Sequence, residues 1–109
     1  MNEAKTYVMD ALEKYKDSIT ILNEQAYQED FLTNAYTASI KFENQHGDIS
    51  RIDYDIRYYI YSGAIDISIT VDPEDLHLTM RSESFYIIEQ LIEQLHKSLF
   101  LSLIHIWRC

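Results

Sequence analysis

Hydrophobic and polar residues alternate between positions 49 and 71, where the sequence reads ISRIDYDIRYYIYSGAIDISITV. One set of alternate positions consists mainly of isoleucine, whereas the other carries aspartate, arginine, serine, threonine and tyrosine. Successive side chains of a β-strand point to opposite faces, so the pattern predicts two strands with one apolar and one polar face. We expect these strands at 49–61 and 64–71, joined by a turn at Ser62-Gly63.

The same period of two continues on both sides of this hairpin. Residues 37–43 predict a preceding strand, and the polar segment 44–48 predicts the loop between them, since Gly47 can adopt the positive φ of tight turns. Residues 72–75, Asp-Pro-Glu-Asp, are typical of a type I turn, although they also fit the start of a short helix. A fourth strand is expected at 76–81, which completes a four-stranded antiparallel meander.

Two further segments have the three- and four-residue spacing of amphipathic helices. The apolar positions of the first are Ala4, Val8, Ala11, Leu12, Tyr15, Ile19 and Leu22. Those of the second are Phe85, Ile88, Leu91, Ile92, Leu95 and Leu99. Between the first helix and the sheet, residues 18–36 show no consistent period. They fit a short strand at 18–22 or a continued helix, followed by a linker that contains a second short helix.

The order of these elements predicts an α+β fold. One face of the sheet is apolar and two amphipathic helices, one N-terminal and one C-terminal, are available to cover it, so we expect a two-layer sandwich. A one-residue slip of the strand at 64–71 would expose Ile65 and Ile67 and bury Asp66, which fixes the sidedness of the sheet. The length of 109 residues fits a single domain, which we place at residues 1–100.

The last nine residues, LSLIHIWRC at 101–109, are similar to the conceptual translation of a sequencing-library adapter. We therefore expect the native sequence to be interrupted at about residue 100, and we set the tail aside as non-native. Trp107 and Cys109 are the only tryptophan and cysteine, so the rest of the sequence offers no disulfide, thiol nucleophile or cysteine metal site. The alternative is that these residues are the apolar end of the last helix.

The chain has a formal net charge of −9. A field of this sign repels nucleic-acid phosphates and anionic membranes and attracts basic partners, so we expect no direct binding to nucleic acid or membrane. Acidity that serves solubility alone explains the charge equally well. No stretch is long and apolar enough to span a bilayer, and the N-terminus lacks the pattern of a secretory signal, which favours a cytoplasmic protein.

The candidate catalytic groups are not arranged as an active site requires. Asp53 and Asp55 share the polar face with Asp66 and Asp72, but arginines and hydroxyls lie among them, as is typical of solvated cross-strand pairs. The histidines at 46, 77, 96 and 105 are scattered and are expected at the surface or, as for His96 near a helix C-terminus, in a position that compensates the helix dipole. The sequence shows neither a calcium loop nor a glycine-rich phosphate loop. We therefore predict no enzymatic activity, no metal and no cofactor.

We interpret the polar face as a binding surface for a basic protein, as in an immunity protein or a nuclease inhibitor. Tyrosine offers a large contact area at low entropic cost, while carboxylates provide electrostatic complementarity. The predicted contact residues are Asp53, Asp55, Arg57, Tyr59, Tyr61, Asp66 and Asp72. The alternative is a dimeric chaperone or assembly adaptor of a secretion system or phage, which self-associates through Ile87, Leu91 and Leu95 of the last helix.

Overall fold

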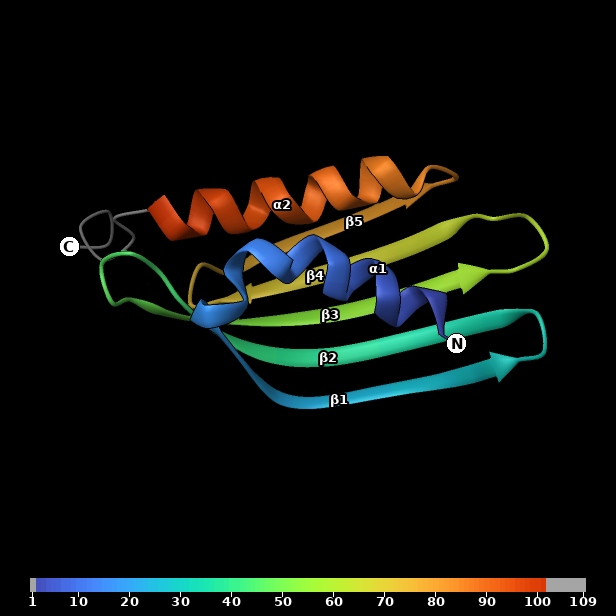
Figure 1. The fold of residues 1–109 in the computed structure, drawn as a ribbon, viewed down its shortest axis with the longest axis horizontal. Coiled ribbons are helices and arrows are strands. Elements are labelled where there is room, and N and C mark those ends of the chain that lie inside the picture. The colour runs from blue at the N-terminus through green and yellow to red at the C-terminus, as the bar shows by residue number, and fades with distance from the viewer. Residues whose placement is uncertain (1, 102–109) are drawn as a thin grey trace.

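The computed structural model describes residues 2–101 (Figure 1). The chain begins with helix α1 (Glu3–Leu12) and a short 3-10 helix, η1 (Glu13–Ser18). Five strands follow, namely β1 (Ile19–Asp30), β2 (Thr33–Glu43), β3 (Ile49–Tyr59), β4 (Ile65–Asp72) and β5 (Leu76–Ser82). Helix α2 (Phe85–Leu101) ends the described part of the chain.

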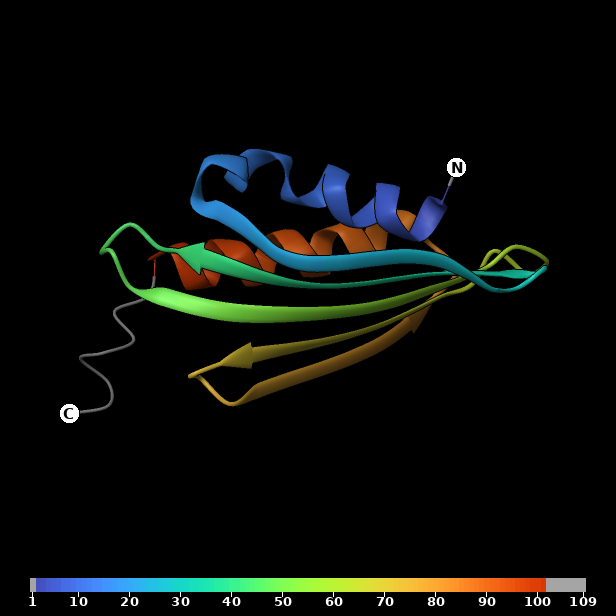
Figure 2. The same cartoon turned by 90° about the horizontal axis from the view of Figure 1, so that it is seen from below.

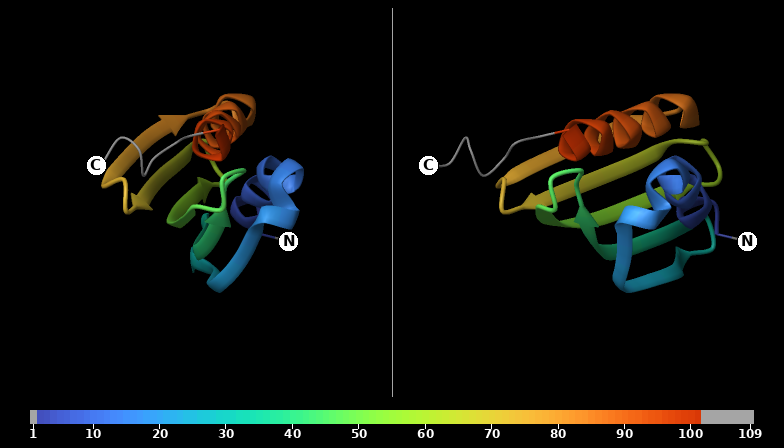
Figure 3. Two further views of the ribbon diagram at one scale, coloured as in Figure 1. Left: turned by 90° about the vertical axis from the view of Figure 1, so that its left-hand side faces the viewer. Right: turned by 60° about the vertical axis from the view of Figure 1, so that its left-hand side comes forward.

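The five strands form one antiparallel sheet in the order β1-β2-β3-β4-β5, so each strand pairs with its neighbours in sequence. Both helices lie on the same side of this sheet, next to each other, as Figures 2 and 3 show. The predicted α+β fold with an antiparallel sheet is confirmed, but the predicted number of four strands is wrong. We call the side of the sheet beneath the helices the inner face and the opposite side the outer face.

The additional strand is β1, which occupies most of the segment 18–36 that lacks a consistent period. It is an edge strand, and nearly all of its side chains are exposed. Its pairing with β2 is irregular between Ile21 and Asn23 and again between Gln28 and Asp30. A strand that buries little and contains such bulges leaves no clear alternation of apolar and polar residues in its sequence. The expected linker with a second short helix is therefore wrong.

The first helix is shorter than its apolar spacing predicts. α1 ends at Leu12, the chain continues as η1, and Ile19 already belongs to β1. Tyr15 departs from helical geometry, with φ −114° and ψ 15°, so the positions beyond it do not extend the same helical stripe. The Tyr15 ring still packs on the core, against Phe42 and Phe100.

The predicted hairpins are present, with changes at their ends. β2 begins at Thr33, earlier than predicted, and β3 ends at Tyr59 instead of Tyr61. Gly47 has a φ of 81°, the left-handed conformation that favours glycine in the loop between β2 and β3. The connection between β4 and β5 at residues 73–75 is a turn and not the start of a helix.

The core lies between the inner face and the helices. The apolar residues of β3 and β4 pair across their hairpin, with Ile52 opposite Val71 and Ile56 opposite Ile67. The fully buried side chains come from both helices and three strands, and include Val8, Tyr36, Ile40, Phe42, Ile52, Tyr54, Ile56, Ile65, Ile69, Ile88 and Ile92. Burying one large aliphatic side chain is worth roughly 1.5–3 kcal/mol, so this shared core holds the sheet with the polar positions outward.

The core also contains a buried polar pair, Tyr54 and His96. His96 belongs to α2 and is fully buried, so the expectation that it lies at the surface is wrong. Its Nε2 atom shares a hydrogen bond with the Tyr54 hydroxyl, and its ring packs against Phe42 and Tyr15. Burial lowers the pKa of His96 to about 4, so the imidazole is neutral at physiological pH.

Of two expectations about segments, only the one about a membrane span can be compared with residues 2–101. No helix within this range combines the length and the apolar character needed to cross a bilayer. The suspected non-native tail at 101–109 lies outside the described residues, apart from Leu101 at the end of α2.

Candidate protein-binding face

The predicted contact residues on β3 and β4 lie on the outer face, which the helices leave open (Figure 2). Their neighbours in sequence, such as Ile52, Ile56 and Ile67, are buried on the inner face, so the alternation places the polar side chains outward. The register of β3 and β4 sets Arg57 opposite Asp66. Tyr61 is an exception, because it lies in the turn that follows β3.

Arg57 links two carboxylates on the outer face. Its Nη1 atom lies 2.9 Å from Asp55 Oδ1, and its Nε atom lies 3.1 Å from Glu29 Oε2. The hydrogen bond to Glu29 and the nearby charge of Asp55 raise the pKa of Arg57. This guanidinium therefore ties the edge strand β1 to β3 across the intervening β2.

Asp66 is the centre of a second group of polar contacts. Its Oδ2 atom accepts a hydrogen bond of 3.0 Å from the Tyr59 hydroxyl, and its Oδ1 atom lies 3.0 Å from Arg81 Nε. The Arg81 guanidinium also lies 5.2 Å from the centre of the Tyr59 ring, a cation–π contact. The hydrogen bond to Asp66 raises the pKa of the Tyr59 hydroxyl. Contacts between side chains of β3, β4 and β5 therefore fix the positions of the Tyr59 ring and the Arg81 guanidinium.

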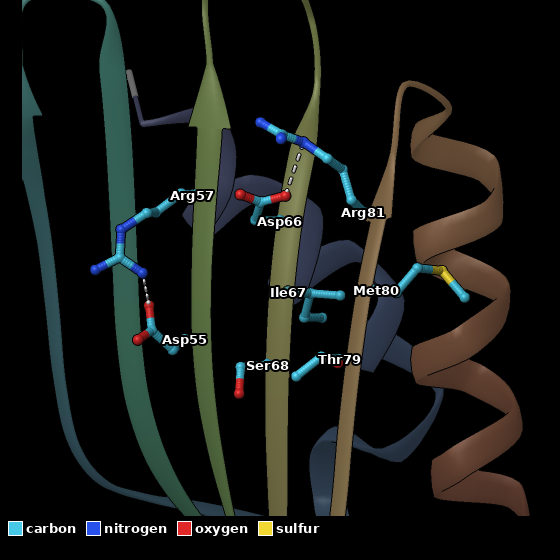
Figure 4. Close-up of a pocket in the computed structure, with 8 residues that line it drawn as sticks. All are labelled: Asp55, Arg57, Asp66, Ile67, Ser68, Thr79, Met80 and Arg81. Atoms are coloured by element: carbon cyan, nitrogen blue, oxygen red, sulfur yellow. Dashed lines mark hydrogen bonds and ion pairs between the residues drawn. The ribbon is translucent and has the colours of Figure 1, made fainter.

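These two groups border a shallow hollow of about 330 Å³ on the outer face (Figure 4). Asp55 and Arg57 lie on one side of it and Asp66 and Arg81 at its upper end in that view. It is lined by Asp55, Arg57, Asp66, Ile67, Ser68, Thr79, Met80 and Arg81. The hollow is therefore mixed in charge, with each arginine paired to a carboxylate.

Asp53 and Asp72 are placed apart from this hollow. Asp53 accepts hydrogen bonds from the Ser39 hydroxyl and from Arg51 Nε, the latter at 3.3 Å. Asp72 ends β4, where it pairs in register with Arg51. Six residues separate Asp53 from Tyr59, or roughly 20 Å along a strand. The structure therefore spreads the predicted contact residues along β3 and β4 and does not gather them in one place.

Exposed apolar side chains gather at the end of the sheet near Tyr59. The turns β1–β2 and β3–β4 lie at this same end (Figure 1), and the Ile60 amide donates a 2.8 Å hydrogen bond to the Leu32 carbonyl. Phe31 and Tyr61 are 80% and 90% exposed. We call Phe31, Leu32, Ile60 and Tyr61 the turn cluster. Part of it lines a second hollow of about 550 Å³, with Asp30, Phe31, Leu32, Thr33, Tyr59, Tyr61, Ser62 and Arg81 around it.

Phe31, Leu32 and Arg81 were not among the predicted contact residues. Phe31 and Leu32 lie in the expected linker, where nothing indicated a tight turn between two strands. Arg81 could have been found from the sequence, because residues 76–81 alternate and their polar positions share a face with those of β4. The turn cluster required β1 to be recognised first.

The outer face carries only part of the excess negative charge of the chain. Its acidic side chains are Glu29, Asp30, Glu43, Asp53, Asp55, Asp66 and Asp72, and its basic ones are Lys41, Arg51, Arg57 and Arg81. Much of the excess acid therefore lies elsewhere, on α1, η1, α2 and the loops. The outer face can offer either sign of charge to a partner, and its arginines are already engaged in ion pairs with carboxylates.

The histidines of the described part of the chain, residues 2–101, are not gathered with other possible metal ligands. Within residues 2–101 no three histidine, cysteine, aspartate or glutamate side chains are grouped as a metal site requires. His77 is bonded to the Thr70 hydroxyl at 3.0 Å, while His46 lies in the loop between β2 and β3. Neither has an acidic partner that would make it a general base.

The residues expected to form a dimer interface lie in different environments. Ile87 is 48% exposed, near the start of α2, beside the exposed Tyr86. Leu91 is partly buried against the core, and Leu95 belongs to the core. Two of the three side chains are therefore used within the subunit.

Comparisons of the chain with protein-family models, with curated proteins and with solved structures gave no match.

Proposed function

We propose that this protein binds another protein through the outer face, with the turn cluster at the centre of the contact. The observation that carries the proposal is the exposure of Phe31 and Tyr61, both of which line one hollow. Large apolar side chains that gather on a surface and are rimmed by polar groups are typical of protein–protein contacts. No catalytic role is proposed for these residues.

Tyr59 and Arg81 extend this contact site onto the strands. Tyrosine and arginine are enriched among the residues that contribute most to binding. Both side chains are already held by Asp66, so little conformational entropy is lost when a partner immobilises them. The hollow beside them would receive an apolar side chain of the partner.

We further propose that the partner is basic. The net charge of −9 accelerates the encounter with a positively charged protein. The carboxylates of Asp53, Asp55 and Asp66 already interact with arginines, so a cation of the partner would replace one ion pair by another. These carboxylates therefore contribute to the rate of association more than to the final affinity.

The role of the turn cluster is tested with the double variant Phe31→Ala/Tyr61→Ala. The partner is captured from an extract of the source cells, purified, and titrated calorimetrically against wild type and variant. We expect Kd to rise at least about tenfold, because two exposed aromatic contact residues together contribute more than about 1.4 kcal/mol. Tyr86→Ala is the matched control, since Tyr86 is an exposed tyrosine on α2. Equal losses in control and double variant would exclude the turn cluster as the contact site.

The proposed attraction between these carboxylates and a basic partner is tested separately with the triple variant Asp53→Asn/Asp55→Asn/Asp66→Asn. Association should become slower and less dependent on salt, while the dissociation rate stays close to that of wild type. Stopped-flow measurements at several salt concentrations give both rates. An unchanged association rate would show that these carboxylates do not attract the partner.

A second function, as a self-associating chaperone or assembly adaptor, has one observation in its favour. Tyr86 and Ile87 expose two large apolar side chains next to each other at the start of α2. Such a pair on a helix could contact a second subunit. Size-exclusion chromatography with light scattering tests this function, because a monomer over a wide range of concentrations is incompatible with it.

A further inference from the structure

The edge of β1 that faces away from β2 has no neighbouring strand within residues 2–101, since β1 is first in the sheet order. The strand is 12 residues long, exposed over nearly its whole length and free of proline. Backbone N–H and C=O groups along such an edge form a template to which another extended chain can add. The opposite edge strand, β5, has seven residues, and its inner side chains pack against the core.

An apolar hollow of about 180 Å³ lies beside the first part of this edge, between α1 and β1. It is lined by Met9, Leu12, Glu13, Lys16, Ile19 and Ile21. Ile21 is 45% exposed there, and Leu22 next to it is also exposed. In a chain that pairs with the free edge of β1, every second side chain points to the inner side of the sheet. The hollow lies on that side. When a chain adds to a sheet as a further strand, its backbone hydrogen bonds provide the affinity. Pockets of this kind receive its side chains and provide the specificity.

The charges of this region decide between a second copy and a different protein. Residues 3–30 contain seven acidic and three basic side chains. β1 itself contains Glu24, Glu29 and Asp30 and no basic residue, and two of these carboxylates already pair with other strands or helices, Glu24 with Lys5 and Glu29 with Arg57. Pairing β1 with β1 of a second copy would bring acidic strands together in two molecules of net charge −9. An extended segment that carries lysine or arginine is complementary to the same edge.

We propose that β1 is a docking edge for an extended basic segment of a different protein. The segment adds to the sheet as a further strand and places an apolar side chain in the hollow between α1 and β1. This surface is distinct from the turn cluster, and the proposal does not depend on the function proposed for the outer face.

The probe for this proposal is a short fluorescent peptide of alternating lysine and isoleucine, titrated against the full chain by fluorescence anisotropy. Two matched peptides accompany it: one has glutamate in place of lysine, and the other has methylated backbone nitrogens at alternate positions. We expect saturable binding of the lysine peptide, no binding of the glutamate peptide, and at least about a tenfold loss on methylation, which removes backbone hydrogen bonds. Equal binding of the lysine and glutamate peptides would overturn the proposed charge preference.

The place of binding is tested with Ile21→Asn and its control Ile49→Asn. Both isoleucines are about half exposed, so both variants should fold, which circular dichroism verifies. We expect Ile21→Asn to weaken the binding of the peptide about fivefold and Ile49→Asn to leave Kd unchanged. Amide hydrogen exchange with the wild-type chain should show new protection in residues 19–30 when the peptide is added. Protection confined to β3 and β4 would refute the docking edge, and β1 protection that grows with protein concentration alone would identify a second copy as the occupant.

Discussion

The Tyr54–His96 pair shows how one buried ionisable side chain makes the stability of this protein depend on pH. The imidazole of His96 lies in an aromatic environment, with Phe42, Tyr15 and Tyr54 around it. Burial disfavours its charged form and lowers its pKa to about 4, from 6.5 in the unfolded chain. The unfolded chain therefore binds a proton at His96 at a higher pH than the folded chain does.

The first prediction is that the protein loses stability in mild acid. The contribution of neutral His96 is fully present above about pH 6.5 and is lost as pH falls from there through about 4. The full loss is on the order of 3 kcal/mol, because one pKa unit corresponds to about 1.4 kcal/mol. Urea unfolding at a series of pH values between these limits measures it.

The control for this prediction is the double variant Tyr54→Phe/His96→Leu. Removing both partners of the buried hydrogen bond together leaves no unsatisfied polar group, so the variant should remain folded. It should also lose most of the pH dependence between about pH 6.5 and 4.5, where few carboxylates titrate. A pH dependence equal to that of wild type would assign the acid sensitivity to other groups.

Individual side chains could be predicted where the alternation fixes their face. Asp55, Arg57 and Asp66 lie outward as expected, because their isoleucine neighbours must lie inward. The ion pair between Arg57 and Glu29 could not be predicted, because Glu29 belongs to the part of β1 that the sequence pattern did not reveal. The burial of His96 also depends on tertiary packing: its position near the end of a helix gives no sign that aromatic rings from η1 and β2 surround it.

At the scale of elements, Asn2 connects the start of α1 to the sheet. Its Oδ1 atom accepts a 3.0 Å hydrogen bond from the Lys5 amide, which caps the helix. Its Nδ2 group donates to the carbonyls of Tyr27 and Ala35, at 3.2 and 3.0 Å. One side chain thus terminates a helix and holds it above β1 and β2.

The second prediction is that Asn2→Ala destabilises the protein by about 2 kcal/mol. The variant loses the helix cap, worth about 1 kcal/mol, together with two hydrogen bonds to the sheet. Asn2→Asp separates the two effects, because aspartate keeps the capping oxygen but cannot donate to the carbonyls. We expect its stability in urea unfolding to lie between those of wild type and Asn2→Ala. If Asn2→Asp equals wild type, the bonds to the sheet contribute nothing.

The elements differ in how far the sequence predicts them. The hairpin β3–β4 and the helix α2 were predicted because each buries one side against the core, which imposes a period of two or of 3.6 on its residues. Only the start of β1 was among the alternatives, as a short strand at 18–22, and its continuation to Asp30 was not predicted, because an exposed edge strand has no buried side to impose a period. The turn cluster, which depends on β1 for one of its two turns, was hidden for the same reason.

At the scale of the whole molecule, the net charge of −9 acts on stability. The radius of gyration is 14.1 Å, so charges on opposite sides interact when the Debye length is about 30 Å, at an ionic strength of about 0.01 M. At about 0.15 M the Debye length falls to about 8 Å, and the repulsion across the molecule is screened. The exposed ion pairs of the outer face are screened as well, but such pairs are worth about 0–1 kcal/mol each.

The third prediction is that added salt stabilises the folded protein at neutral pH. The urea concentration at the midpoint of unfolding should rise between about 0.01 M and about 0.15 M sodium chloride, because screening relieves self-repulsion in the compact state. Repeating the comparison near pH 4.7, where the formal net charge vanishes, is the control, and the effect of salt should be much smaller there. A midpoint that falls with salt at neutral pH would mean that the ion pairs of the outer face outweigh the repulsion.

The sequence by itself determined the two-sidedness of the central strands, the antiparallel order of the hairpins and the position of α2, because burial of one side leaves a period along the chain. The tertiary structure decided which outer-face carboxylates meet which arginines, that His96 is buried, and that Phe31 and Tyr61 line one hollow at the end of the sheet. His96 and Arg81 contact residues far from them in sequence, and the hollow also depends on an edge strand that buries too little to mark its own position. The candidate binding face was therefore predicted as a face, whereas its centre followed from the fold.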